Sequence, residues 1–252
     1  MKTRYTFHTV LLIALLLGGL FHFSACTSDS KRAETQIRVS TPPRPAGQTD
    51  VVGLTCEPIE TVLIGFICLG ARGTEAIRRF TYQKGIHVNA LCDLNQFRVD
   101  SCQNMLSRSN MPEATTYYGS EDVWKQVCER DDIDLIYIAT DWIHHAPMMI
   151  YAMEHGKHVA CEVPAAMTLD EIWKVIDTAE RTRKHCMMLE NCVYDFFEIT
   201  TLNMAQQGLF GNITHVKGAY NHCLYDIWPD YNADWRMQYN MAHRGDVYPT
   251  HG

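Results

Sequence analysis

The sequence predicts an α/β protein built on a doubly wound parallel sheet. Apolar, partly β-branched runs of strand length alternate with helical patterns between residues 61 and 189. The first run enters a glycine-containing turn that opens a helix, which is how a βαβ unit begins. The 252-residue chain has 46% hydrophobic and 20% charged residues. This composition is typical of a globular chain with a substantial core, and it excludes disordered, collagen-like and coiled-coil classes.

Charge and cysteine usage exclude further classes. The chain has 22 Lys and Arg against 29 Asp and Glu, a net charge of −7, whereas a general nucleic-acid binder carries a basic face. Its ten cysteines are scattered, and no two of them form a CxxC pair at zinc-binding spacing. We interpret them as structural thiols and predict no metal site.

The amino terminus, residues 1–26, is predicted to be a signal peptide. Lys2 and Arg4 precede an apolar run, residues 10–20, that is too short to span a bilayer as a helix. Small residues then precede Cys26 in a pattern like a bacterial lipobox, so Cys26 is expected to carry a lipid anchor. The alternative is ordinary cleavage after Ala25. In both cases we expect export from a bacterial cytoplasm to the periplasm or cell envelope, with membrane contact only through that anchor.

A linker is predicted over residues 27–59, where Ser, Thr, Pro and charged residues replace apolar periodicity. The predicted dinucleotide-binding domain covers residues 60–192.

The first βα turn of that domain carries an incomplete dinucleotide fingerprint. In the pattern G-x-G-x-x-G, the first glycine permits the tight turn, the second the approach of a pyrophosphate, and the third close helix packing. Here Cys68 holds the first place, while Gly70 and Gly73 hold the other two. The strand predicted over 61–67 and the helix over 74–84 flank this turn in the expected order. A glycine-rich turn in an unrelated doubly wound domain is the alternative.

An acidic residue supports the nucleotide hypothesis. The second predicted strand, 86–92, ends at Asp93, which lies 20 residues beyond Gly73. A carboxylate at this place accepts hydrogen bonds from the adenosine ribose hydroxyls and disfavours a 2′-phosphate. We therefore expect NAD rather than NADP, bound by a Rossmann domain.

Three later strands end in polar residues, where ligands of parallel sheets bind. The strand 134–140 precedes Asp-Trp-Ile-His-His at 141–145, and 157–161 leads into Glu-Val-Pro at 162–164. A capping box at 168–171 opens a helix to about residue 183, and the strand 185–189 ends before Glu-Asn. The paired histidines lack a carboxylate or cysteine at matching spacing, which argues against zinc.

The chain resembles the Gfo/Idh/MocA oxidoreductase family, and most closely its glycoside hydrolase family 109 branch. The resemblance runs from about residue 60 to the end, and six segments carry it: Gly65 to Gly73, Thr140 to His145, Cys161-Glu162-Val163-Pro164-Ala165, Glu190-Asn191-Cys192-Val193-Tyr194, Asp234-Trp235-Arg236 and Tyr248-Pro249-Thr250-His251-Gly252. It implies an NAD-dependent hydrolase acting on glycans with terminal α-N-acetylgalactosamine. Cleavage in that branch proceeds by transient oxidation at the sugar C3, elimination, water addition and re-reduction.

The resemblance also implies the site residues. Gly70, Arg72 and Gly73 would meet the pyrophosphate and Asp93 the ribose. Residues Trp142 to His145, together with Glu162 and Val163, would meet the middle of the cofactor. Asn191 would meet its nicotinamide end. Tyr220, Arg236 and Tyr248 would meet the sugar, with His251 as the acid/base group, since imidazole titrates near neutrality. Core packing for Trp142 and Tyr220, a strand-end cap for Asn191 and a surface ion pair for Arg236 are the alternatives.

Two features bear on the activity. Sugar dehydrogenases of the parent family have a proton-moving Lys where this chain has Val163, so a net dehydrogenase is disfavoured. Related chains continue well beyond the Tyr-Pro-Thr-His turn, which makes residues 193–252 the start of an α+β open-sheet substrate domain. The chain alone is therefore expected to expose apolar surface and to show little or no glycosidase activity. A sugar dehydrogenase and a non-catalytic NAD-binding remnant are the alternative functions. A homo-oligomer is a further open prediction.

Overall fold

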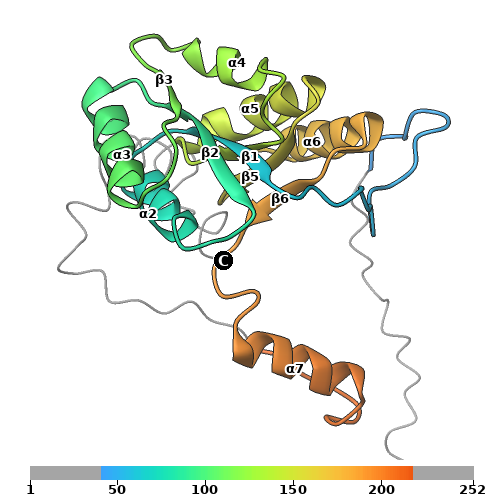
Figure 1. The fold of residues 1–252 in the computed structure, drawn as a ribbon. Helices are drawn as coiled ribbons and strands as arrows, with labels where there is room; N and C mark the ends of the chain where they lie inside the picture. The colour runs from blue at the N-terminus through green and yellow to red at the C-terminus, as the bar shows by residue number, and fades with distance from the viewer. Residues whose placement is uncertain (1–40, 218–252) are drawn as a thin grey trace, which may run out of the picture. The chain divides into compact units, whose positions relative to one another are not determined.

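The computed structural model describes residues 41–217 and shows a six-stranded parallel sheet in the order β3-β2-β1-β4-β5-β6 (Figure 1). The strands are β1 (Val62–Ile67), β2 (Ile86–Cys92), β3 (Thr115–Tyr117), β4 (Leu135–Ile138), β5 (His158–Glu162) and β6 (Cys186–Leu189). The helices are α2 (Ala71–Phe80), α3 (Gln96–Arg108), α4 (Val123–Cys128), α5 (Trp142–Glu154), α6 (Leu169–Thr182) and α7 (Phe196–Gln206). The predicted doubly wound sheet is confirmed.

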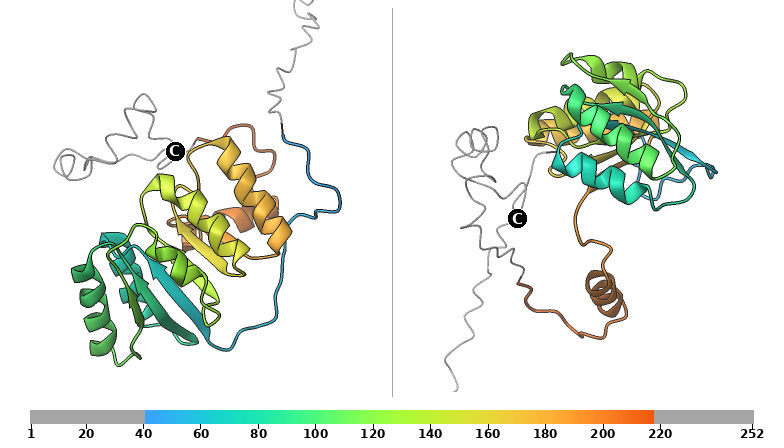
Figure 2. Two further views of the ribbon diagram at one scale, coloured as in Figure 1. Left: turned by 90° about the horizontal axis from the view of Figure 1, so that it is seen from above. Right: turned by 60° about the vertical axis from the view of Figure 1, so that its left-hand side comes forward.

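Two helical layers cover the sheet. Helices α2 and α3 pack on one face, in a core cluster with Phe66 and Tyr137. Helices α4, α5 and α6 pack on the other face, around Ile136 and Ile138 (Figures 1 and 2). Strand β1 pairs with β2 on one side and with β4 on the other, so the direction of winding reverses between β1 and β4. Ligands of such sheets bind at the carboxyl ends of the strands that flank this reversal.

Gly65 lets α4 approach this central strand. A Cβ atom at Gly65 would lie 2.7 Å from Cγ1 of Val127 in α4 and 3.1 Å from Cδ1 of Ile136 in β4. Only a residue without a side chain allows the two layers to meet at this distance.

Two helix boundaries illustrate the local sequence rules. Helix α2 begins at Ala71, three residues earlier than predicted, because the glycine turn itself supplies the first helical turn and Thr74 N–H donates to the Gly70 carbonyl at 2.9 Å. The predicted capping box of α6 is confirmed: Thr168 and Glu171 exchange side-chain and backbone hydrogen bonds. Arg183 ends that helix in the left-handed region, with φ of 55°.

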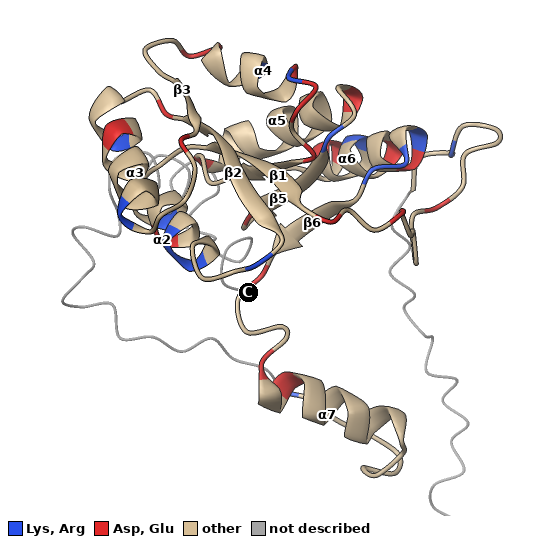
Figure 3. Cartoon of the chain, in the orientation of Figure 1, with Lys and Arg blue, Asp and Glu red and all other residues tan. Residues whose placement is uncertain are grey.

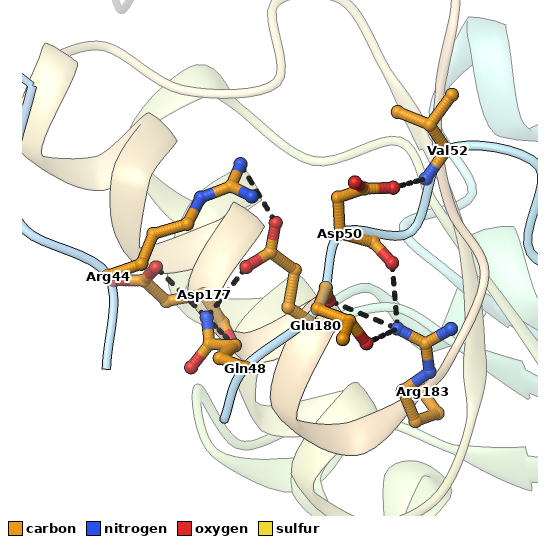
Figure 4. Close-up of polar contacts among 8 residues, drawn as sticks. Arg44, Gln48, Asp50, Val52, Asp177, Glu180 and Arg183 are labelled. Carbon is orange, nitrogen blue, oxygen red and sulfur yellow. Dashed lines mark hydrogen bonds and ion pairs between the residues drawn. The ribbon is translucent and has the colours of Figure 1, made fainter. Parts of the chain in front are cut away.

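The described part of the predicted linker lies along α6 (Figure 4). Arg44 forms an ion pair of 3.0 Å with Glu180, whose side chain is almost fully buried. Gln48 donates to the same carboxylate at 2.8 Å and to Asp177 at 3.2 Å. Arg183 donates to the backbone carbonyls of Thr49 and Asp50. Because a buried carboxylate requires such partners, Glu180 orders the arm, a long-range effect that composition alone does not signal.

Apolar side chains of the last described elements are exposed. The edge strand β6 exposes Met187 and Met188 by 42% each, and α7 has no buried residue.

Within residues 41–217, no helix is both long and apolar enough to cross a membrane.

Candidate functional site

A cavity of about 540 Å³ opens at the carboxyl ends of β1, β2 and β4. Its polar lining comes from the loops after these strands and includes Asp93, Asn95 and Asp141. Trp124 and Met148 form part of its apolar wall. The cavity therefore lies at the topological reversal, with a few polar groups converging on an apolar pocket.

The turn between β1 and α2 forms one edge of this cavity and explains the incomplete fingerprint. Cys68 has φ of 72°, the left-handed conformation that a first glycine adopts without strain. Its N–H donates to the Cys92 carbonyl at 2.8 Å, which ties the turn to β2. Burial raises the pKa of the Cys68 thiol, so the side chain is a neutral, compact substitute. The turn thus keeps its shape at a steric cost of about 1–2 kcal/mol.

The other two glycines have separate roles. A Cβ at Gly73 would lie 2.0 Å from the Cys68 carbonyl oxygen, so Gly73 is required for the close contact between helix and strand. Gly70 has an ordinary φ of −63°, and a Cβ there would meet nothing nearer than 4.0 Å. The open surface at Gly70 fits the close approach of a pyrophosphate to the backbone.

Asp93 is buried at the junction of the two βα turns. Its carboxylate accepts hydrogen bonds from Leu69 N–H at 2.7 Å and Asn95 N–H at 2.8 Å. Arg98, on the first turn of α3, lies 3.6 Å from the same carboxylate and also lines the cavity. The carboxylate is therefore fixed beside the cavity. It has lone pairs left to accept hydrogen bonds from the ribose hydroxyls of a dinucleotide.

The histidine pair at the start of α5 is divided between cavity and core. His144 lines the cavity and its Nδ1 lies 2.5 Å from the capping carboxylate of Asp141. His145 is buried, with its ring nitrogens 2.6 Å and 3.1 Å from the carbonyls of Pro164 and Thr140. Burial lowers the pKa of His145, while the two carbonyls, which would both accept from a protonated ring, oppose that shift. Of the predicted range Trp142 to His145, the structure thus places His144 at the cavity surface and His145 in the core, with Trp142 half-buried.

A second polar group lies across the turn from Asp93. Arg72, in the first turn of α2, forms an ion pair of 3.0 Å with Glu162 at the end of β5. Its Nη2 donates to Asn191 Oδ1 at 2.8 Å. Tyr137 of β4 donates its hydroxyl to the other oxygen of Glu162 at 2.6 Å. Three of the predicted cofactor residues are therefore in direct contact, while Val163 follows Glu162 as a half-buried apolar side chain.

The residues present fit an NAD molecule. The glycine turn opens a helix amino terminus, where free N–H groups and the helix dipole favour phosphate. Helix α2 carries three arginines and one glutamate, and none of its first-turn residues is acidic (Figure 3). A buried carboxylate stands on the ribose side and a guanidinium on the other. Within the described range, no three His, Cys, Asp or Glu side chains gather as a metal-binding group.

Sequence reasoning missed two residues of these groups. Arg98 lines the cavity, and Tyr137 supports Glu162. Arg98 had a signal, since it lies five residues beyond Asp93 on a helix capped by Asn95. Tyr137 had none, because it occurs within an otherwise apolar run. The predicted sugar and acid/base residues, Tyr220, Arg236, Tyr248 and His251, lie outside the described residues.

The fold and cavity define a dinucleotide-binding α/β domain, and comparison with known proteins gives its family. Residues 60–190 match the family model described as "Oxidoreductase family, NAD-binding Rossmann fold", and residues 194–252 match "Glycosyl hydrolase 109, C-terminal domain". The chain belongs to the Gfo/Idh/MocA oxidoreductase family and, within it, to the glycoside hydrolase family 109 branch.

Individual relatives agree with this assignment. The chain is 61% identical over 243 residues to glycosyl hydrolase family 109 protein 1 of Bacteroides fragilis, covering 96% of this chain and 52% of that protein. It is 51% identical over 211 residues to an alpha-N-acetylgalactosaminidase of the same species, covering 81% and 49%. The chain thus spans about half the length of these relatives.

A solved structure supports the fold alone. Scyllo-inositol dehydrogenase from Lactobacillus casei, with bound NAD(H) and scyllo-inositol, superposes with a TM-score of 0.54 at 18% sequence identity, covering 61% of this chain and 43% of that one.

Proposed function

We propose that the whole protein, of which this chain spans the NAD-binding half, is an NAD-dependent glycosidase that removes terminal α-N-acetylgalactosamine. The observation that carries this proposal is the continuous match of one chain to an NAD-binding Rossmann domain and then to a family 109 C-terminal domain. The proposed substrate follows from the relative that is named alpha-N-acetylgalactosaminidase.

NAD would supply hydride acceptance and hydride return at the sugar C3, so that oxidation assists bond cleavage without net redox change. The chain's own residues bind and orient. The backbone at Gly70, Arg72 and the amino end of α2 would hold the pyrophosphate, and Asp93 would hold the adenosine ribose. Asn191 would meet the nicotinamide end. His251, outside the described residues, is proposed to move protons at the sugar.

The group beside the nicotinamide end has little capacity for proton transfer. Glu162 already interacts with Tyr137 and Arg72. Val163 can neither donate nor accept a proton, where a net sugar dehydrogenase has a lysine. This arrangement supports elimination driven by groups elsewhere over a net oxidation. A sugar dehydrogenase is the second candidate, favoured only by the shared fold, and an NAD-binding remnant without activity is the third.

The test is p-nitrophenol release from an aryl α-N-acetylgalactosaminide. It is measured with this chain and with one extended to the length of its relatives, each with NAD retained and with NAD stripped. We expect release by the longer chain, its loss on stripping and its return with NAD⁺, and little or no release by the 252-residue chain. Release that is indifferent to NAD would refute the redox-assisted mechanism. Net NADH formation from free sugars would support the dehydrogenase instead.

We further propose that the protein is exported and anchored through Cys26. Metabolic labelling with a radioactive fatty acid tests this, because the label should appear in the wild type and disappear in Cys26→Ser. Labelling of neither protein would favour ordinary cleavage after Ala25.

A further inference from the structure

Tyr137 occupies an unusual place for a polar side chain. It is 5% exposed in the central strand β4, and its ring stacks on Phe66 with centroids 4.9 Å apart. Phe80 of α2 meets the ring edge to face at 6.0 Å. The aromatic contacts fix the ring, so the hydroxyl has one direction, toward Glu162 Oε1 at 2.6 Å. Burial raises the pKa of the phenol, and the hydroxyl therefore remains a hydrogen-bond donor at all physiological pH values.

The bond from Tyr137 begins a chain of contacts that reaches the cofactor turn. Glu162 receives the hydroxyl on Oε1 and the Arg72 guanidinium on Oε2, at 3.0 Å. Arg72 also donates through Nη2 to Asn191. Its Nη1 has no hydrogen-bond partner among residues 41–217, and its side chain is 40% exposed. Glu162 of β5 and Asn191, in the loop after β6, thus hold the guanidinium, and Tyr137 of β4 supports Glu162; one edge of the guanidinium is still available.

The position of Arg72 indicates what that edge is for. A cation in the first turn of a helix faces the positive end of the helix dipole, which disfavours it by about 0.3–1 kcal/mol at an exposed site. Glu162 compensates for part of this, at the cost of desolvating a carboxylate. Despite the unfavourable helix dipole and the desolvated carboxylate, the arrangement concentrates positive charge at the amino end of α2, where backbone N–H groups are also available. Such a site attracts an anion, and a planar guanidinium binds phosphate oxygens in pairs.

We propose that Tyr137 is a positioning residue of the cofactor site. It acts through Glu162 to hold the Arg72 guanidinium toward the pyrophosphate and nicotinamide half of NAD. The proposal rests on the cofactor assignment made above. It gives Tyr137 a role in only one half of the site, because the adenosine side is formed by the separate cavity that includes Asp93 and contains no member of this network.

The selectivity for one half of the cofactor supplies the test. Binding of NAD and of AMP is titrated by calorimetry and ligand-observed NMR, with the wild type, Tyr137→Phe and a control, Tyr151→Phe. The control also loses a hydrogen bond from a tyrosine hydroxyl to a glutamate, here an exposed one from Tyr151 on α5 to Glu129, the residue that follows α4. In metal sites, removing a partner that orients a ligand side chain weakens binding by about 10-fold or more, and we take the same order here. We therefore expect the NAD Kd of Tyr137→Phe to rise about 10-fold, its AMP Kd to stay within about twofold, and the control to match the wild type.

Several outcomes would overturn the proposal. Equal weakening of NAD and AMP in Tyr137→Phe would indicate general loss of structure, and unchanged NAD affinity would remove any positioning role. If Tyr137→Phe does not fold, Glu162→Gln, which keeps the shape but removes the ion pair, must show the same selective loss of NAD. The Tyr137→Phe effect must also vanish in a Glu162→Ala background. A wild type that binds neither ligand would instead refute the cofactor assignment itself.

Discussion

Replacing Gly73 by alanine should destabilise the whole domain. The new Cβ would lie 2.0 Å from the Cys68 carbonyl oxygen, whereas ordinary contact begins at 3.4 Å, so helix and turn must separate by 3.4 − 2.0 = 1.4 Å. The clash is with backbone, which cannot move aside as a flexible side chain can. Overpacking of this severity costs at least about 3 kcal/mol. At about 2–4 °C per kcal/mol for a domain of this size, Tm should fall by roughly 6–12 °C.

Gly70→Ala is the matched control. With φ of −63° and no atom nearer than 4.0 Å to the new Cβ, this change should leave Tm within about 2 °C of the wild type. The added methyl group stands where the pyrophosphate would approach, so NAD affinity should fall by about 10-fold, or 1.4 kcal/mol. Thermal unfolding by circular dichroism and NAD titration separate the two effects. A Tm of Gly73→Ala equal to that of the wild type would refute the steric argument, and undiminished NAD binding by Gly70→Ala would refute the cofactor pose.

Three further predictions concern pH, thiols and the arm. Burial lowers the pKa values of His145 and His158 below 6.5. As the pH falls below 6.5 the unfolded chain therefore binds protons more readily than the folded one, so the free energy of unfolding should be highest above pH 6.5 and decline below it. A plot of Tm against pH should be flatter for His145→Gln than for the wild type. An aryl disulfide reagent at pH 8 should label the exposed Cys56 first and Cys192 later, because the neighbouring carboxylate of Asp195 raises the pKa of Cys192. Burial raises the pKa values of Cys92, Cys128 and Cys186 to about 12, so these thiols should react only on unfolding. Peptide mass mapping identifies which thiols carry the label. Arg183→Ala should increase hydrogen exchange in residues 44–54 while leaving the sheet protected; unchanged exchange would mean that the arm is held without Arg183.

The fold was predictable because the relevant signals are local. Each buried strand is a short apolar run, and the Thr168 capping box lies within four residues of sequence. Helix starts were less predictable, since α2 begins inside the glycine turn. The order of the arm depends on Glu180, more than 130 residues from Arg44, and no local pattern reports such a contact.

The candidate site was predictable where a residue stands at a strand end. Asp93, Glu162 and Asn191 satisfy this rule. Arg72, in the first turn of α2, contacts the last two of them. The distinction between His144 and His145 was not available from sequence, because neighbouring helix positions differ by about 100° in direction and only packing decides which side faces the cavity.

The close contact at Gly65 has a consequence for interpreting related chains. Of the three glycines between residues 65 and 73, Gly65 allows α4 to pack on β1 and Gly73 allows α2 to pack on the turn at Cys68, whereas Gly70 faces open space where a ligand would lie. Evolution can therefore discard these glycines independently. A relative that keeps Gly65 and Gly73 but has a bulky residue at Gly70 would have retained the scaffold and abandoned the dinucleotide. A glycine count over this segment would not reveal that loss, whereas the identity of the one missing glycine would.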